Sequence, residues 1–82
     1  MPRVILTPSF ADLYAGGKVE HEVPGLTIRH LIRHLDERYP GIGQHLSHGV
    51  AVAIDGEIYQ NALLEEVGVH SEVCFMPAIE GG

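Results

Sequence analysis

Apolar and polar residues recur with a helical period in one part of the chain. Four apolar residues follow the spacing i, i+3, i+4, i+7 that gives an α-helix one apolar stripe: Ile28, Leu31, Ile32 and Leu35. Thr27 can cap the start of this helix with its hydroxyl oxygen. Tyr39 precedes Pro40, and a residue before proline is pushed out of helical geometry. The pattern therefore predicts one amphipathic helix between Thr27 and Tyr39.

Strands are predicted on both sides of this helix. Residues 18–23 alternate with period two, which places Val19, His21 and Val23 on one side of a half-buried strand. Residues 50–54 form an apolar run that we interpret as the central buried strand. The predicted strands cover residues 3–7, 18–23, 50–54, 57–60 and 72–76. We expect a loop over 9–17 and single helical turns in the connections 41–49 and 61–66.

This order of elements predicts an α+β fold. A first pair of strands, a helix packed across them and further strands give a mixed sheet of four to five strands with one main helix on one face. A chain of 82 residues is long enough for one domain. We assign residues 1–76 to that domain and residues 77–82 to a flexible C-terminal tail.

The opposite face of the sheet is predicted to stay open. In the last strand Glu72, Cys74 and Met76 share one side, and Val73 and Phe75 share the other. Glutamate is rarely buried, so Val73 and Phe75 are expected to pack under the helix.

Small and soft apolar residues then fall on the open face beside the tail. Ala51 and Ala53 are expected there with Cys74 and Met76, and such a patch is typical of a docking surface. We predict these four residues as a partner interface. The alternative is an ordinary surface, on which scattered apolar side chains are common.

Charge and composition exclude several classes of protein. Eleven Asp and Glu against five Lys and Arg give a net charge of −6, which disfavours nucleic acid and favours a partner with a basic surface. No apolar run has the length that a membrane span needs. The single cysteine excludes an internal disulfide, and the N-terminus lacks a signal-peptide pattern. We expect a cytoplasmic protein without a membrane partner.

The sequence offers little catalytic chemistry of its own. His30 and His34 have the i, i+4 spacing of a helical metal site, but no third ligand accompanies them, so we expect no metal. Cys74 has no neighbouring base or cation in the sequence that would activate its thiol. We interpret it as a structural or surface thiol.

The C-terminal residues carry the main candidate site. Glu80 is followed by Gly81 and Gly82, and two glycines make the slimmest and most pliable chain end. Such a tail can enter a narrow channel and present the Gly82 carboxylate there. Pro77 stiffens the root of the tail because its ring restricts the backbone.

The chain resembles the MoaD/ThiS group of ubiquitin-like sulfur carriers over essentially its whole length. Three segments carry the resemblance: Arg38-Tyr39-Pro40-Gly41, the run from Val50 to Gly56, and the final stretch from Val73 to Gly82 with its proline and terminal diglycine. The resemblance implies the β-grasp fold. It also implies that Gly82 is the reactive residue, with Pro77, Glu80 and Gly81 entering the partner's channel.

By the same resemblance, an ATP-dependent, ubiquitin-activating-like enzyme adenylates Gly82. A cysteine desulfurase or rhodanese then supplies sulfur for a thiocarboxylate, which an acceptor synthase uses. The chain is a protein co-substrate rather than an enzyme and binds no cofactor, since it lacks a phosphate-binding glycine loop and the partner supplies ATP and Mg²⁺. Molybdopterin synthesis is favoured as the pathway, and thiazole or cysteine synthesis stays open.

Two positions depart from the family pattern. His70-Ser71 precedes Glu72-Val73 where a Gly-Asp pair is common, and Glu80 stands where a small residue is common. We expect Glu80 to influence the choice of partner. Two other functions remain open: a ubiquitin-like modifier that forms isopeptide bonds with lysine, and an interaction domain that uses only the open sheet face.

Overall fold

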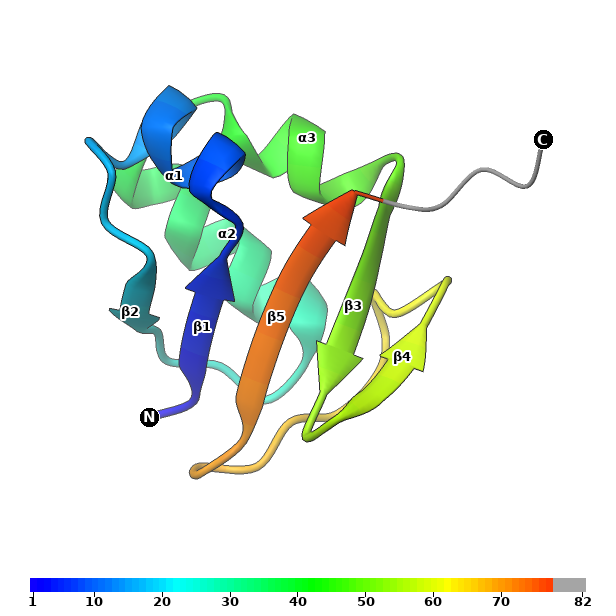
Figure 1. Ribbon diagram of the computed structural model, residues 1–82. Helices are drawn as coiled ribbons and strands as arrows, with labels where there is room; N and C mark the ends of the chain where they lie inside the picture. Colours follow the sequence, from blue (N-terminus) through cyan, green and yellow to red (C-terminus); the bar gives the residue numbers. More distant parts are fainter. Residues whose placement is uncertain (78–82) are drawn as a thin grey trace, which may run out of the picture.

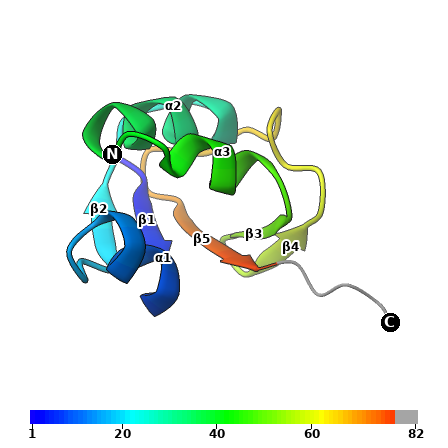
Figure 2. The ribbon, with the colours of Figure 1, turned by 90° about the horizontal axis from the view of Figure 1, so that it is seen from above.

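A five-stranded sheet with helices on one side forms the body of the protein. The structure is a computed structural model that describes residues 1–77. Its strands are β1 (Arg3–Leu6), β2 (Glu20–Glu22), β3 (Val50–Ile54), β4 (Glu57–Tyr59) and β5 (Glu72–Pro77). Its helices are α1 (Pro8–Tyr14), α2 (Ile28–Arg38) and α3 (Ile42–Ser47). Helices α2 and α3 lie on the same side of the sheet, and α1 follows the end of β1 (Figures 1 and 2).

The sheet is mixed, with the strand order β2-β1-β5-β3-β4. β1 and β5 run parallel, and the other neighbours are antiparallel. The prediction that residues 50–54 form the central strand is wrong, because β5 occupies the centre and β3 lies next to it. Both strands are rich in apolar residues, and only the pairing between distant segments decides which of them is central.

The core lies between the sheet and α2, as predicted. The apolar stripe of α2 is buried, and Val73 and Phe75 of β5 have no exposed surface. The Thr27 hydroxyl accepts a hydrogen bond from the His30 amide at 3.3 Å, which confirms the predicted cap. The helix ends at Arg38, and Tyr39 is its C-cap residue.

The prediction of a loop over residues 9–17 is wrong. Residues 8–14 form α1, with Pro8 in its first turn, where the missing proline N–H costs no helical hydrogen bond. Ala11 is fully buried, and Phe10 and Tyr14 pack against the core. This spacing of Phe10, Ala11 and Tyr14 was the available signal for a short helix.

The other two connections differ from each other. α3 supplies the helical turn that was expected between residues 41 and 49. Residues 61–66 contain turns but no helical turn. This segment instead bonds to the start of α2, where the Ile28 amide donates to the Glu65 carbonyl at 3.0 Å.

Candidate functional site

The root of the tail is set by the last residue of β5. Pro77 pairs with Val50 at the beginning of β3, whereas β1 ends opposite Phe75. At Pro77 the strand therefore has a neighbour on one side only, and a proline without an N–H is tolerated at such a place. The predictions for Glu80, Gly81 and Gly82 concern residues that lie outside the described part of the chain.

Strand register brings the four predicted interface residues together. Ala51 pairs with Met76, and Ala53 pairs with Cys74, on the sheet face opposite α2. Cys74, Met76 and Ala53 are half-buried, and Ala51 is only 4% exposed. Ala51 therefore contributes little accessible surface, and contact with a partner depends on its neighbours.

Two further residues belong to the same face. Ile5 of β1 pairs with Cys74, and Ile58 of β4 pairs with Ala53 and is 63% exposed. We call these neighbours the open-face patch: Ile5, Ala51, Ala53, Ile58, Cys74 and Met76. Sequence reasoning missed the two isoleucines, although the parity of their own strands could have indicated them.

The open face also carries charges beside this patch, on β2 and at the starts of β1 and β5. Arg3 of β1 forms an ion pair with Glu72 of β5 and lies 4.0 Å from a carboxylate oxygen of Glu20 in β2. Glu22 is also exposed on β2, opposite Arg3. Lys18 and Arg38 line the same hollow as Arg3, Glu20 and Glu22, so charges of both signs are mixed at this end of the face.

Cys74 lies in an environment that keeps its thiol protonated. Partial burial raises the pKa of the Cys74 thiol, and the nearby Glu72 carboxylate raises it further, while Arg3 lowers it. A thiolate is the nucleophilic form of cysteine. The raised pKa therefore agrees with the interpretation of Cys74 as a structural or surface thiol.

A buried polar pair ties β2 to the end of α2. His21 is 2% exposed, and its Nε2 lies 2.9 Å from the hydroxyl oxygen of Tyr39. Burial lowers the pKa of His21, and the positive charges of Lys18 and Arg38 lower it further. We interpret the pair as structural, because His21 is buried and β2 is separated from β5, which leads to the tail, by β1.

The histidines of α2 belong to no metal-binding cluster in the part of the chain that the structure describes. His30 Nδ1 accepts a hydrogen bond from the Leu26 amide at 3.3 Å. Within residues 1–77, no group of three or more His, Cys, Asp or Glu side chains is arranged to hold a metal ion. None of the helices in this described part is long and apolar enough to cross a membrane.

The model of the ThiS family matches residues 9–82, which include the terminal diglycine. The chain belongs to the ThiS family. A curated relative of this ThiS-family chain is the molybdopterin synthase sulfur carrier subunit of Pyrenophora tritici-repentis (strain Pt-1C-BFP). The two are 30% identical over 81 residues, which cover 95% of this chain and 87% of the relative.

Solved structures show that the ThiS-family chain has the ubiquitin-like β-grasp fold, as predicted. It is similar to a chain in the crystal structure of the Amycolatopsis orientalis BexX/CysO complex, with a TM-score of 0.85, 22% identity and 100% of both chains covered. Mycobacterium tuberculosis CysO gives a TM-score of 0.85 at 19% identity, covering 96% of this chain and 100% of CysO. The small archaeal modifier protein SAMP1 of Methanosarcina acetivorans has a TM-score of 0.79 at 17% sequence identity, with 99% of this chain and 95% of SAMP1 covered.

Proposed function

We propose that the chain is a sulfur carrier whose Gly82 carboxylate is adenylated and then converted to a thiocarboxylate. The observation that carries this proposal is the family match, which runs through the terminal diglycine. The name of the Pyrenophora relative, a sulfur carrier subunit, supports the same chemistry. Reducing conditions in the cytosol suit a carrier with one free cysteine, and we place its activity there.

The chemistry requires two substitutions at the tail. A carboxylate oxygen of Gly82 attacks the α-phosphorus of ATP, a P–O bond forms, and pyrophosphate leaves with the electrons of the broken P–O bond. The outer sulfur of the donor's persulfide then attacks the carboxyl carbon, AMP leaves, and an acyl disulfide forms. A second thiol attacks the donor's sulfur and breaks the S–S bond, so the chain keeps the outer sulfur as a thiocarboxylate and the donor's cysteine forms a disulfide with that thiol. ATP and Mg²⁺ belong to the adenylating partner, so this chain acts as a protein co-substrate.

The position of Pro77 supports this role, because Pro77 ends the central strand directly before the residues that carry the candidate site. β5 lies in the centre of the sheet and anchors the root of the tail through its pairing with β3. The open-face patch extends along β5 to Met76, one residue before Pro77. A partner that receives the tail can therefore dock on this patch at the same time, and Glu80 would meet that partner inside its channel.

We infer that the acceptor is a synthase and favour a molybdopterin-type reaction, because the curated relative is named for molybdopterin synthase. Thiazole and cysteine synthesis are the alternatives. The three are separated by incubating the thiocarboxylate form with each class of acceptor synthase and measuring which one regenerates the carboxylate.

The proposal is tested by the intact mass of the chain. The full-length protein is incubated with ATP, Mg²⁺, the adenylating enzyme of its own genome, a thiol reductant, and either a cysteine desulfurase with cysteine or a rhodanese with thiosulfate. We expect the mass to rise by an oxygen-to-sulfur exchange, and a chain without Gly81 and Gly82 to stay unchanged. Lysine conjugates in place of the exchange would instead identify a protein modifier, and an unaltered carboxylate would contradict both functions.

A further inference from the structure

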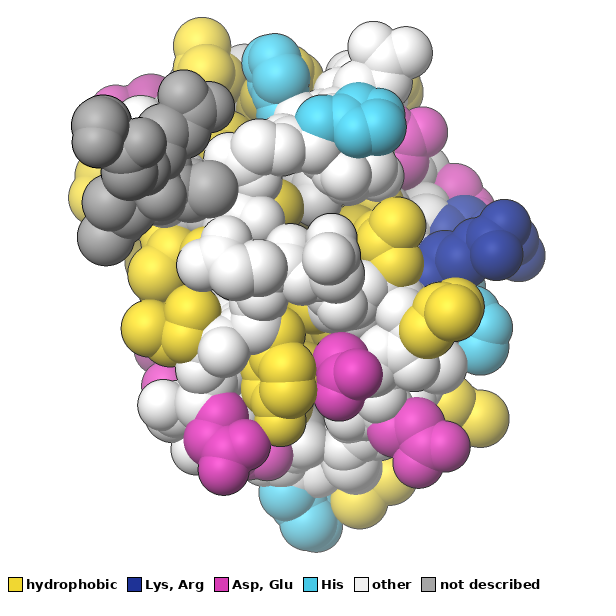
Figure 3. Space-filling model, turned by 90° about the vertical axis from the view of Figure 1, so that its right-hand side faces the viewer, with side chains coloured by type: hydrophobic (Ala, Val, Ile, Leu, Met, Phe, Trp, Pro, Cys, Tyr) yellow, Lys and Arg dark blue, Asp and Glu magenta, His cyan; other side chains and the backbone are white. Residues whose placement is uncertain are grey.

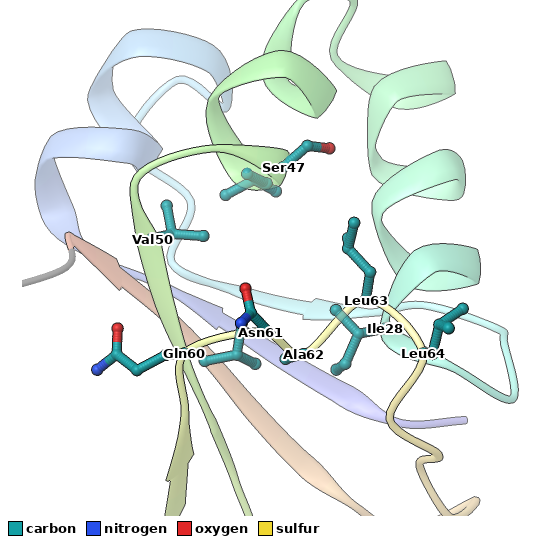
Figure 4. Close-up of a pocket in the computed structure, with 10 residues that line it drawn as sticks. Ile28, Ser47, Val50, Gln60, Asn61, Ala62, Leu63 and Leu64 are labelled. Carbon is teal, nitrogen blue, oxygen red and sulfur yellow. The ribbon is translucent and has the colours of Figure 1, made fainter.

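A second surface feature lies on the helix side of the sheet. A pocket of about 330 Å³ opens between α2, α3, β3 and the segment 60–64 (Figure 4). Ile28, Leu46 and Val52 are buried residues of its wall. Figure 4 shows Asn61 pointing into the space between Val50 and Leu63, while the Gln60 amide turns away. The pocket is therefore apolar with one carboxamide directed into it.

Hydrogen bonds hold the outer wall of this pocket in place. The Ile28 and Arg29 amides donate to the carbonyls of Glu65 and Leu63, at 3.0 Å and 2.9 Å. Amides in the first turn of a helix have no partner within the helix, so these bonds satisfy groups that would otherwise need water or a cap. Because the segment is fastened to α2, the pocket is preformed.

The rim of the pocket exposes apolar side chains. Leu63 is 40% exposed and Leu64 is 77% exposed. On this side of the molecule, hydrophobic side chains lie among carboxylates, and Lys and Arg side chains appear only at one margin (Figure 3). An apolar rim around an apolar pocket is typical of a contact with another protein.

The position of the pocket relative to the tail identifies that protein. Val50 lines the pocket and pairs with Pro77, where the tail begins. The five residues 78–82 span at most about 18 Å when fully extended. A stable interface buries about 800 Å² on each partner. Because Val50 both lines the pocket and pairs with Pro77, the interface of a protein that holds Gly82 in its active site can extend to the mouth of the pocket.

We infer that this pocket receives a branched aliphatic side chain from an extended segment of the adenylating partner. The inference rests on the proposed function, because it needs a partner that takes the tail. The wall of the pocket is apolar, and the exposed Leu63 and Leu64 continue this apolar surface at the rim, which suits an aliphatic side chain of a protein partner. The Asn61 carboxamide has both donors and an acceptor, so it matches the peptide group that flanks such a side chain.

The test measures adenylation with the adenylating enzyme of the same genome. Val50→Phe fills the pocket, and Asn61→Ala removes the carboxamide at a site away from the root of the tail. We expect KM for the carrier to rise about tenfold for Val50→Phe and about threefold for Asn61→Ala, with kcat nearly unchanged. Leu13→Ala is the matched control, since Leu13 is 68% exposed on α1, and its KM should equal that of the wild type.

The outcomes separate the inference from the proposed function. If the wild type is adenylated and both pocket variants keep its KM, the pocket has another occupant, such as a free metabolite, and the inference is overturned. A loss in kcat without a change in KM would also overturn it, because that result indicates a misplaced tail. If the wild-type chain is not adenylated at all, the proposed function itself fails. Thermal melts establish that each variant is folded.

Discussion

The two faces of the sheet are built from alternate residues of the same strands, yet they differ in almost every property. Val73 and Phe75 of β5 are fully buried beneath the helices, while their neighbours Cys74 and Met76 are only half-buried on the open face. Burial of apolar area provides most of the folding free energy. The covered face thus stabilises the fold, and the open face is free to bind a partner.

Deletion of the tail glycines should have the largest effect on adenylation while leaving both faces of the sheet intact. Deleting Gly81 and Gly82 removes the carboxylate that is proposed to react, so we expect adenylation to be lost completely. The deleted residues lie beyond β5, and the free energy of unfolding should equal that of the wild type. Pyrophosphate exchange and urea denaturation measure the two quantities, and residual exchange in the deleted chain would contradict the assignment of Gly82.

Neighbouring residues of β5 should differ strongly in their effect on stability. Phe75→Ala leaves a cavity in the covered face and should lower the free energy of unfolding by about 3–5 kcal/mol. Met76→Ala removes a half-buried side chain from the open face and should cost less than about 1.5 kcal/mol. Urea denaturation tests the pair, and equal losses would show that the open face is as important for folding as the covered face.

When binding to the adenylating partner is measured instead of stability, the open face should matter more than the covered face. Met76→Glu places a carboxylate in the open-face patch, where a partner would have to desolvate it. We expect KM for adenylation to rise about tenfold while the protein stays folded. Leu26→Glu serves as control, since Leu26 is 68% exposed just before α2 and outside the patch. A patch variant that behaves like this control would leave the open face without a docking role.

The smallest predicted effect concerns the buried histidine of the covered face. The pKa of His21 is lowered in the folded protein, so below about pH 6.5 the unfolded chain binds a proton more readily than the folded chain. Stability should therefore decrease as the pH falls from about 6.5 through the lowered pKa of His21.

His21→Gln should flatten this decrease, because glutamine does not titrate. His48→Gln is the control, since His48 is exposed in the connection after α3 and should leave the wild-type profile unchanged. Unfolding free energies measured across this pH range would show the difference. An equal slope in the wild type and His21→Gln would mean that other groups cause the pH dependence.

Local patterns were sufficient to predict the elements with strong periodicity. The stripe from Ile28 to Leu35 and the cap at Thr27 predicted α2, and the parity of residues 72–76 predicted which side of β5 is buried. α1 was missed because it is only seven residues long and its apolar positions cover little more than one turn. The segment 61–66 was misjudged because its backbone partners are on α2, far away in the sequence.

The residues of the candidate site also fall into two groups: those that the sequence alone predicts and those that only strand pairing brings together. The diglycine and Pro77 are visible in the sequence alone, because the chemistry of a slim, reactive chain end depends only on which residues stand there. The open-face patch was predicted in part, through the parity of β3 and β5. Its two isoleucines come from β1 and β4, and only the pairing of these strands with Cys74 and Ala53 brings them to the patch.

The sequence by itself therefore determined the fold class, the family and the residue that is proposed to react, since each depends on local periodicity or on a short motif. The tertiary structure decided that β5 is the central strand, that Val50 adjoins both Pro77 and the pocket, and that His21 meets Tyr39. These relations join segments that are distant along the chain. Their free energy comes from packing and strand pairing between those segments, which no local pattern records.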